Sequence, residues 1–387
     1  RVRSIMVSGF VSDKNKTKAV QYKLSGHNSS VPPWVSAPAR QARCYENYGQ
    51  MPRPMQKNTA QAEKYRAKPL TSQQTQTTMN TEANRKTEWV VGIGEALWDI
   101  LPEGRKIGGA PANFAYHMSQ FGLRSCAVSA VGDDEAGREL RNQLREKRVG
   151  HMLETVPFPT GTVEVTLDGA GIPSYEIRQG VAWDNIPFTP QIEELARHTR
   201  AACFGSLAQR SPVSHRTIGR FLETMPDGEG QYKVFDINLR QHFYTQQVVE
   251  ESLRKCNILK INDEELAVVG GMFGMEGMQP GEQCRTLLDR YGLRIVILTC
   301  GAAGSSVFAL DTRSYIPTPR VEVADTVGAG DSFTASFLAA LLLGLGIGEA
   351  HRLAVDVAAH VCSQHGAMPR LPERFTARLR NDGSAIR

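Results

Sequence analysis

The sequence predicts an α/β protein, a three-layer α/β/α sandwich with a mainly parallel sheet and a small β lid. Short apolar runs such as Trp89–Gly94 alternate along the chain with amphipathic stretches such as Asp134–Lys147, the rhythm of a parallel sheet covered on both faces. Two stretches with a period of two, 162–167 and 174–177, interrupt that rhythm and predict a hairpin outside the main sheet.

The remaining elements follow from the same patterns, taken in chain order. We expect further strands at 125–131, 201–204, 233–237, 258–261 and 294–299, and a second hairpin at 307–310 and 314–316. We expect helices at 111–121, 134–147, 190–198, 213–225, 246–256, 263–269 and 283–291, and then two long helices. The lid is assigned to residues around 99–108 and 162–178.

Charge is spread unevenly along the 387 residues. Residues 1–88 carry 15 Lys and Arg against 5 Asp and Glu, a net charge of +10, whereas the rest carries 30 against 35, a net charge of −5. A nucleic-acid surface would therefore have to lie in the first segment, where the basic residues are scattered rather than clustered. We expect no nucleic-acid partner.

Residues 1–88 differ from the rest because they are rich in Gln, Ser, Thr, Asn, Pro and Lys and have no lasting periodicity. Such a segment buries too little apolar surface to offset its ordering entropy. It is either a basic targeting leader or an untranslated stretch with Met79 as the true start, and we favour the second reading. We assign 1–88 to this leader, 89–372 to the main domain and 373–387 to a C-terminal tail.

The seven cysteines are widely separated and form no CxxC pair or His/Cys cluster, which supports neither a zinc site nor a disulfide framework. This usage fits a reducing cytosol, and we expect a cytoplasmic protein. No uninterrupted apolar run reaches the length of a membrane span, so we expect no membrane partner.

The stretch Asp325–Phe333 (DTVGAGDSF) carries the strongest functional signal. Gly328 and Gly330 flank Ala329, so the backbone can turn tightly and approach a ligand. Apolar residues then recur at helical spacing, and a helix N-terminus offers unpaired N–H groups to an anion. Asp331 lies in that first turn, where it serves either as a proton acceptor or merely as a helix cap.

Polar clusters directly follow five of the predicted strands, and the first two clusters below both follow the first strand. They are Glu95 and Asp99; Gly108 to Asn113; Gly205 and Ser206; Asn238 to Arg240; Asn262 to Glu265; and Thr299 to Gly304. The carboxyl ends of parallel strands meet at one edge of a sheet, where ligands bind. We therefore expect these clusters and the 328–331 turn to form one site.

With these motifs in view, residues from about Trp89 to Leu371 resemble the ribokinase-like (PfkB) sugar kinases and, among them, most closely the fructokinases. The resemblance rests on 108–115 (GGAPANFA) and 325–333, in this order and about 220 residues apart. The stretches 94–99 (GEALWD) and 182–186 (AWDNI) are similar to the fructokinase branch.

The resemblance implies a role for each matching position at the acceptor end of the site. The sugar hydroxyls would be held by Asp99, Gly108, Gly109 and Asn113, with Phe114 either lining the pocket or belonging to the core. Asn238 and Arg240 would reach the sugar or the transferring phosphate, since Arg has the fork geometry for oxyanions.

The family's cofactors are ATP and Mg²⁺. Asn262 and Glu265 would orient the hydrated Mg²⁺, and Thr299, Gly301 and Gly304 would form the nucleotide wall, with Gly366 near adenine. The chain has no GxxxxGK[ST] motif, so the phosphates must rely on the amides of Gly328, Ala329, Gly330 and Asp331. The resemblance also implies a monovalent-cation (K⁺) site near Asp325 and a homodimer paired through the lid.

The expected reaction is ATP-dependent phosphorylation of a primary hydroxyl on a small sugar, D-fructose to D-fructose 6-phosphate. Asp331 would accept the hydroxyl proton and the turn amides would stabilise the phosphoryl charge. Three other acceptors stay open: ribose, 2-keto-3-deoxygluconate and a nucleoside. From a different class, an inactive relative that serves as a binding or regulatory subunit also stays open.

Overall fold

The computed structural model describes residues 88–101, 104–167 and 173–381 of the chain. The leader up to residue 87 lies outside the described residues, as do 102–103 and 168–172 of the expected lid and the last six residues.

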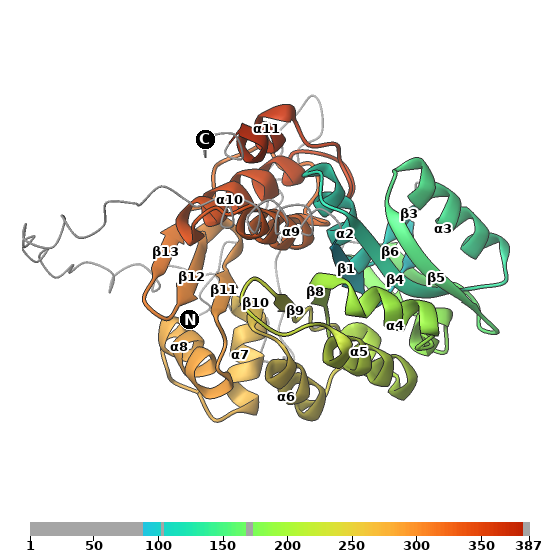
Figure 1. Ribbon diagram of the computed structural model, residues 1–387, viewed down its shortest axis with the longest axis horizontal. Helices are drawn as coiled ribbons and strands as arrows, with labels where there is room; N and C mark the ends of the chain where they lie inside the picture. The colour runs from blue at the N-terminus through green and yellow to red at the C-terminus, as the bar shows by residue number, and fades with distance from the viewer. Residues whose placement is uncertain (1–87, 102–103, 168–172, 382–387) are drawn as a thin grey trace, which may run out of the picture. The chain divides into compact units, whose positions relative to one another are not determined.

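A nine-stranded sheet forms the centre of the described part of the chain (Figure 1). Its order is β13-β12-β11-β10-β9-β8-β1-β4-β5, and neighbours run parallel except in the pairs β11–β12 and β12–β13. The strands are β1 (Trp89–Ile93), β4 (Ser125–Gly132), β5 (Gly150–Val156), β8 (Thr199–Phe204), β9 (Tyr232–Asp236), β10 (Ile258–Asn262), β11 (Ile295–Thr299), β12 (Ser305–Ala309) and β13 (Arg313–Ile316). All eight residues of β4 are buried, as expected for a strand covered on both faces.

Helices cover both faces of this sheet, which confirms the predicted three layers. One face carries α2 (Ala110–Gln120), α3 (Glu135–Glu146), α9 (Ala329–Leu342), α10 (Ile347–Cys362) and α11 (Glu373–Asn381). The other carries α4 (Pro190–Arg197), α5 (Pro212–Thr224), α6 (Gln246–Lys255), α7 (Asp263–Met272) and α8 (Pro280–Tyr291). Their starts follow capping chemistry: the Asp134 side chain, for example, accepts a hydrogen bond from the Gly137 N–H at the start of α3.

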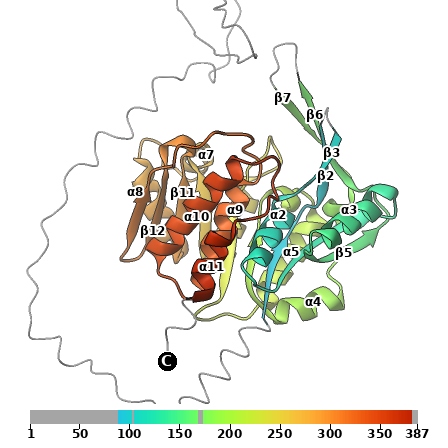
Figure 2. The same cartoon turned by 90° about the horizontal axis from the view of Figure 1, so that it is seen from above.

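A smaller four-stranded sheet, in the order β3-β2-β6-β7, projects beside the main sheet (Figure 2). It consists of β2 (Leu97–Leu101), β3 (Gly104–Gly108), β6 (Gly161–Leu167) and β7 (Pro173–Ile177). The predicted hairpin is confirmed, because β6 and β7 pair antiparallel, and β2 joins it by parallel pairing with β6.

Two elements were missed by the sequence patterns. β5 forms an edge of the main sheet beside β4, but only Leu153 among its residues is fully buried, so its sequence shows little alternation. α11 lies in the segment assigned to a tail, and Phe375 is the apolar residue that packs it into the core beside α10 and α2. A single buried side chain leaves no readable period.

The strand order reverses between β1 and β8. From β1 the chain builds outward to β4 and β5, and then returns to β8 and proceeds to β9, β10 and β11. In open parallel sheets a crevice forms outside the strand ends at such a reversal. The segments after β1, β8, β9, β10 and β11 are the ones that carry the predicted polar clusters.

Candidate active site

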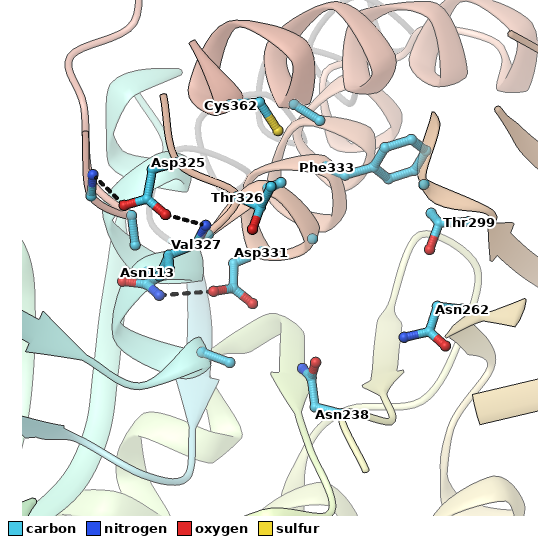
Figure 3. A pocket seen from close by; sticks show the side chains of 18 of the residues that line it. Asn113, Asn238, Asn262, Thr299, Asp325, Thr326, Val327, Asp331, Phe333 and Cys362 are labelled. Carbon is cyan, nitrogen blue, oxygen red and sulfur yellow. Dashed lines mark hydrogen bonds between the residues drawn. The ribbon is translucent and has the colours of Figure 1, made fainter. Parts of the chain in front are cut away.

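A cleft of about 1730 Å³ lies at the carboxyl ends of the strands (Figure 3). It exceeds the few hundred to about 1,000 Å³ usual for one small ligand, so it has room for two. The predicted site residues on its wall are Asp99, Gly109, Asn113, Asn238, Arg240, Asn262, Thr299, Gly301, Gly304, Gly328, Ala329, Gly330, Asp331 and Gly366. Gly108, Phe114 and Glu265 are not on the wall.

Phe114 belongs to the core. Its side chain is 1% exposed and packs with Val90, Met118 and the apolar residues of α9 and α10. Helix α2 points this side chain away from the cleft while it points Asn113 into it, because neighbouring residues on a helix face different directions. Phe114 is therefore a core residue and does not line a sugar pocket.

The turn before α9 has the geometry of an anion site. Gly328 caps the helix with a left-handed backbone, φ 78°, and a Cβ there would come within 2.7 Å of the Ala367 backbone. Only glycine fits this position. The N–H groups of Gly330 and Asp331, in the first turn of α9, have no acceptor within the helix, and both residues line the cleft.

Gly330 differs from Gly328 and corrects the expectation that both glycines serve the turn. Its backbone is helical and needs no positive φ. A Cβ on Gly330 would instead lie 2.9 Å from the ammonium nitrogen of Lys260. Its missing side chain leaves room for that lysine.

Asp331 is held in place across the cleft by α2. Its Oδ2 accepts a hydrogen bond from Asn113 Nδ2 at 2.8 Å (Figure 3). Burial and the nearby charge of Asp236 raise the pKa of Asp331 to about 6, although Asn113, Lys260 and Arg240 act in the opposite direction. At neutral pH the carboxyl is therefore ionised and able to accept a proton.

Asp99, on β2 of the small sheet, forms the other end of the cleft. Burial and the charge of Asp325 raise its pKa to about 6, while Lys106, its neighbour on β3, lowers it. Gly108 contributes by its lack of a side chain, because a Cβ there would overlap the Asp99 carboxylate. Asn113 Oδ1 is buried and has no hydrogen-bond partner among the residues that the structure describes.

Glu95, for which the sequence indicated no role, lies just after β1, where it is 5% exposed and forms part of the cleft wall. Burial is the main reason that its pKa rises to about 7, and the charge of Asp331 adds to the rise. The backbone of Glu95 also explains why residue 109 is a glycine. A Cβ on Gly109, φ 109°, would overlap the Glu95 carbonyl.

Asn238 and Arg240 follow β9. Asn238 has a left-handed backbone, φ 43°, which Asn tolerates better than most residues. The Arg240 guanidinium is exposed at the cleft wall and donates to the Leu239 carbonyl at 3.1 Å and to Asn238 Oδ1 at 3.2 Å. The loop thus presents one amide and one cation to the cleft.

Asn262 and Glu265 form a reciprocal cap at the start of α7. Asn262 Oδ1 accepts from the Glu265 N–H at 2.8 Å, and Glu265 Oε2 accepts from the Asn262 N–H at 2.9 Å. Glu265 Oε1 also accepts from the Leu239 N–H at 3.1 Å, so this buried carboxylate joins two of the loops on the cleft. Burial raises the pKa of Glu265. Glu265 lies behind Asn262 rather than on the wall.

Glycines shape the opposite end of the cleft. Gly301, φ 50°, Gly304, φ 130°, and Gly366, φ 79°, all have backbones that other residues rarely adopt. Asp325 accepts from the Val327 N–H and from the Gly366 N–H, each at 3.0 Å, and so joins the segment before α9 to the segment after α10. The backbone here lies open to a flat ligand, with Thr299 alongside.

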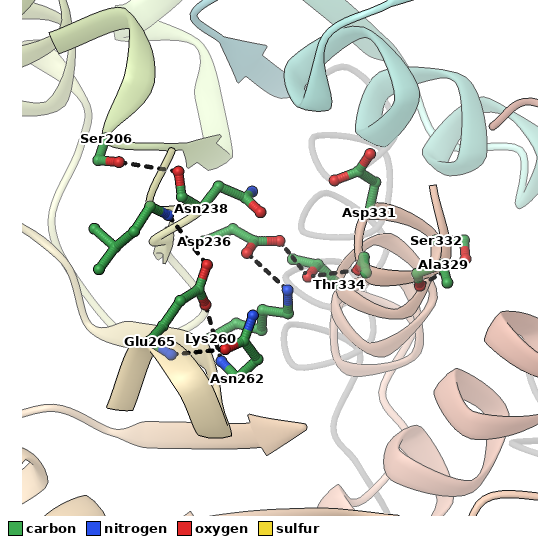
Figure 4. Close-up of polar contacts among 12 residues, drawn as sticks. Ser206, Asp236, Asn238, Lys260, Asn262, Glu265, Ala329, Asp331, Ser332 and Thr334 are labelled. Carbon is green, nitrogen blue, oxygen red and sulfur yellow. Dashed lines mark hydrogen bonds and ion pairs between the residues drawn. The ribbon is translucent and has the colours of Figure 1, made fainter. Parts of the chain in front are cut away.

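An ion pair that was not predicted from the sequence lies beneath α9. Lys260 Nζ lies 3.0 Å from Asp236 Oδ1, and Thr334 of α9 donates to Asp236 Oδ2 at 2.8 Å (Figure 4). Burial alone would lower the pKa of Lys260, but the charges of Asp236 and Glu265 outweigh burial and raise it. The sequence did contain a sign of this pair, because a Lys and an Asp interrupt two apolar strands, in 258–262 (ILKIN) and 234–238 (VFDIN).

Within the described ranges, no three His, Cys, Asp or Glu side chains come together to hold a metal ion. No helix in the same ranges combines the length and the apolar character needed to cross a membrane.

A comparison with known families adds to this geometry. Residues 102–374 match the pfkB family of carbohydrate kinases. The chain belongs to this family. The match covers both halves of the cleft, from the small sheet to the start of α11, and so places the Asp331 turn and the α2 amide in one kinase domain.

Individual relatives of this kinase differ in the acceptor that their names give. The fructokinase of Klebsiella pneumoniae is 30% identical over 269 residues, which cover 65% of this chain and 83% of the relative. A nucleoside kinase of Methanothermobacter thermautotrophicus is 28% identical over 284 residues, 70% of this chain and 84% of the relative. The structure of a sugar kinase from Pyrococcus horikoshii in complex with ATP is similar, with a TM-score of 0.62 and 25% identity, covering 75% of this chain and 99% of that chain.

Proposed function

We propose that this kinase transfers the terminal phosphoryl group of ATP to a primary hydroxyl of a small neutral sugar, D-fructose, to give D-fructose 6-phosphate. The observation that carries the proposal is Asp331 at the N-terminus of α9, hydrogen-bonded to Asn113 and sharing one cleft with Asp99. A base, an anion-binding turn and a group for sugar hydroxyls are what phosphorylation of a polyol requires.

Asp331 accepts the proton of the reacting hydroxyl as the oxygen attacks the phosphorus. Asn113 keeps the carboxylate oriented through its 2.8 Å hydrogen bond and offers its free Oδ1 to another hydroxyl. The N–H groups of the first turn of α9 stabilise the charge on the phosphoryl oxygens. General-base catalysis of this kind contributes about 10²–10⁴-fold.

The glycine-lined end of the cleft suits ATP. Gly301, Gly304 and Gly366 let the backbone lie against a base and ribose, and the turn at Gly328 receives the phosphates. Magnesium, bound with the nucleotide, neutralises phosphate charge. Asn262 would hold it through water while Glu265 fixes the orientation of Asn262, an arrangement that suits an ion carried mainly by phosphates and water.

The small sheet acts in this proposal as a lid. It contributes Asp99, Lys106 and the apolar Leu97 and Val163 to the cleft, so its closure over a sugar would both bind the hydroxyls and exclude water. Exclusion of water suppresses hydrolysis of ATP in place of sugar phosphorylation.

The fructokinase of Klebsiella pneumoniae supports fructose as the acceptor, and the nucleoside kinase of Methanothermobacter thermautotrophicus supports a nucleoside. The test is a panel of fructose, ribose, 2-keto-3-deoxygluconate and adenosine with ATP, Mg²⁺ and coupled detection of ADP. Fructose is expected to give the highest kcat/KM. If another acceptor gives the highest kcat/KM, that acceptor replaces fructose as the proposed substrate. If no acceptor is phosphorylated, the remaining proposal is a binding or regulatory subunit.

A further inference from the structure

Two charged residues lie inside the apolar strands under the active-site helix. Asp236 of β9 and Lys260 of β10 are register partners, and their side chains are 4% and 6% exposed. Burying such a pair costs desolvation that an apolar pair of similar size would not cost. A contribution to stability therefore explains the presence of this pair poorly. Its location beside the active-site helix suggests a role in the reaction.

The pair lies against the first turn of α9. Thr334 donates to Asp236 Oδ2, which leaves Oδ1 facing the ammonium group, and that group lies 2.9 Å from the Cβ position that Gly330 leaves empty. Figure 4 shows the Lys260 side chain directed at Asp236 and ending beside Thr334, with Asp331 at the end of the same helix as Thr334. Lys260 also belongs to the wall of the cleft. The ammonium thus adjoins both the backbone of the anion turn and the space in front of it.

The first turn of α9 alone offers only partial positive charge from its amides. A buried ammonium beside it adds a full charge in surroundings of low polarity, where electrostatic interactions are stronger than in water. Asp236 fixes the direction of that ammonium, so no reorganisation is needed when charge develops on an oxyanion.

We propose that Lys260, held by Asp236 beneath Gly330, is a phosphoryl-binding residue that contacts the group transferred in this cleft. The proposal rests on the proposed phosphoryl transfer. The opposing view is that the pair is structural and merely fastens α9 to the sheet. The two views differ in what happens when both charges are removed together.

The first variants are Lys260→Met and the double variant Asp236→Asn with Lys260→Met. Lys260→Met is expected to lower kcat by at least about 10²-fold while the sugar KM changes less than threefold. It also leaves Asp236 unpaired in the core, so its Tm should fall. The double variant removes that unpaired charge and should recover Tm while kcat stays low. Recovery of kcat together with Tm in the double variant would overturn the proposal.

A matched control is Lys233→Met. Lys233 is another nearly buried lysine, on the opposite end of β9, and forms an ion pair with Asp227 at 2.7 Å. Its loss is expected to lower Tm without changing kcat. A fall of kcat in this control comparable to that of Lys260→Met would show that the assay reports core damage, and would count against the proposal.

Binding gives a readout that is independent of turnover. ADP with aluminium fluoride and sugar mimics the transferred phosphoryl group, and the double variant should bind it at least tenfold more weakly than wild type while binding ADP alone equally well. Equal affinity for the mimic would overturn the role of Lys260.

All assays use the best acceptor of the wild-type panel. A winner other than fructose therefore changes the proposed substrate and leaves the Lys260 comparison intact, whereas a wild type that phosphorylates no acceptor overturns both proposals.

Discussion

Asn113 donates a hydrogen bond of 2.8 Å to Asp331 although the two residues are 218 positions apart in the chain. α2 follows β3 of the small sheet and α9 follows β13, the last strand, so this contact joins an early and a late helix of the sandwich across the cleft. It fixes the carboxylate on the helix end where the phosphoryl group would be transferred, which leads to the first prediction.

Asp331→Asn keeps the size of the side chain but cannot accept a proton at neutral pH. We expect kcat to fall by at least about 10²-fold with little change in the binding of ATP and sugar, since the group acts mainly in the transition state. Steady-state kinetics and calorimetric titrations measure the two effects.

The control for this variant is Glu349→Gln, an exposed acidic residue in the first turn of α10. It should leave kcat unchanged. If Asp331 merely caps α9, Asp331→Asn would behave like the control, because Asn caps about as well as Asp. Near-normal turnover would remove Asp331 from the mechanism.

The pH dependence of the reaction should report Asp331. Its pKa is raised to about 6, so the active, ionised form is complete well above pH 6 and is lost as the pH falls through that value. We expect kcat at saturating sugar to fall about tenfold for each pH unit below about 6, whereas kcat/KM would also contain the titration of Asp99, whose pKa is likewise about 6. A profile that stays flat down to pH 4.5 would exclude a base with this pKa.

Asp99 should govern binding of the acceptor rather than the chemical step. Asp99→Ala removes a partly buried carboxylate from the β2 end of the cleft and leaves sugar hydroxyls unpaired. We expect the sugar KM to rise at least about tenfold, in line with the loss of hydrogen bonds to a charged group, and the KM for ATP to stay the same. Asp133→Ala, at an exposed aspartate of the loop after β4, serves as the control. An unchanged sugar KM would place Asp99 outside the acceptor site.

The two glycines of the turn should respond differently to alanine. Gly328→Ala forces a left-handed backbone and a contact with Ala367, and we expect it to cost about 1–3 kcal/mol of unfolding free energy. Gly330→Ala is helical and should fold normally, yet its Cβ displaces the Lys260 ammonium, so we expect kcat to fall about tenfold to hundredfold. Urea denaturation and kinetics on both variants test this. The assignment of Gly330 fails if the two variants lose stability equally or if Gly330→Ala retains full kcat.

Local patterns predicted the parts of this protein that depend on local chemistry. The apolar runs of β1 and β4, the hairpin β6–β7 and the turn at Gly328 all follow from residue type and spacing. The convergence of the polar clusters followed from the expected parallel order of the strands, which places their carboxyl ends together. Gly205 and Ser206 are the exception, because they are not on the cleft wall.

Features that depend on side-chain direction or on distant neighbours were not predictable in this way. Phe114 and Asn113 are adjacent in sequence, and only the packing of α2 decides which of them faces the cleft. The space left by the missing side chain of Gly330 is filled by Lys260, which lies 70 residues earlier, on β10. The spacing of the glycines alone could not show this contact and suggested only a turn. Edge strand β5 lacks alternation because all its residues except Leu153 are at least partly exposed, so neither face is uniformly buried.

The last prediction concerns the motif 182–186, whose residues the structure places in a buried cluster at the foot of the small sheet. Arg210 forms a bidentate ion pair with Asp184, at 2.8 and 3.0 Å, and its guanidinium lies 4.0 Å from the Trp183 ring centroid. It also donates to the carbonyl of Arg178, just after β7, and so fastens the end of the small sheet to the body.

Arg210→Lys cannot reproduce the planar fork and leaves the nearly buried Asp184 carboxylate partly unpaired. We expect a loss of about 3 kcal/mol of unfolding free energy, the size typical of breaking a buried ion pair, with kcat nearly unchanged below the unfolding transition. Arg197→Lys is the control, because the ion pair of Arg197 with Glu193 on α4 is exposed and should contribute less than about 1 kcal/mol. Urea denaturation monitored by fluorescence measures both variants. A fully stable Arg210→Lys protein with reduced kcat would instead assign Arg210 to the reaction and remove the structural explanation of this motif.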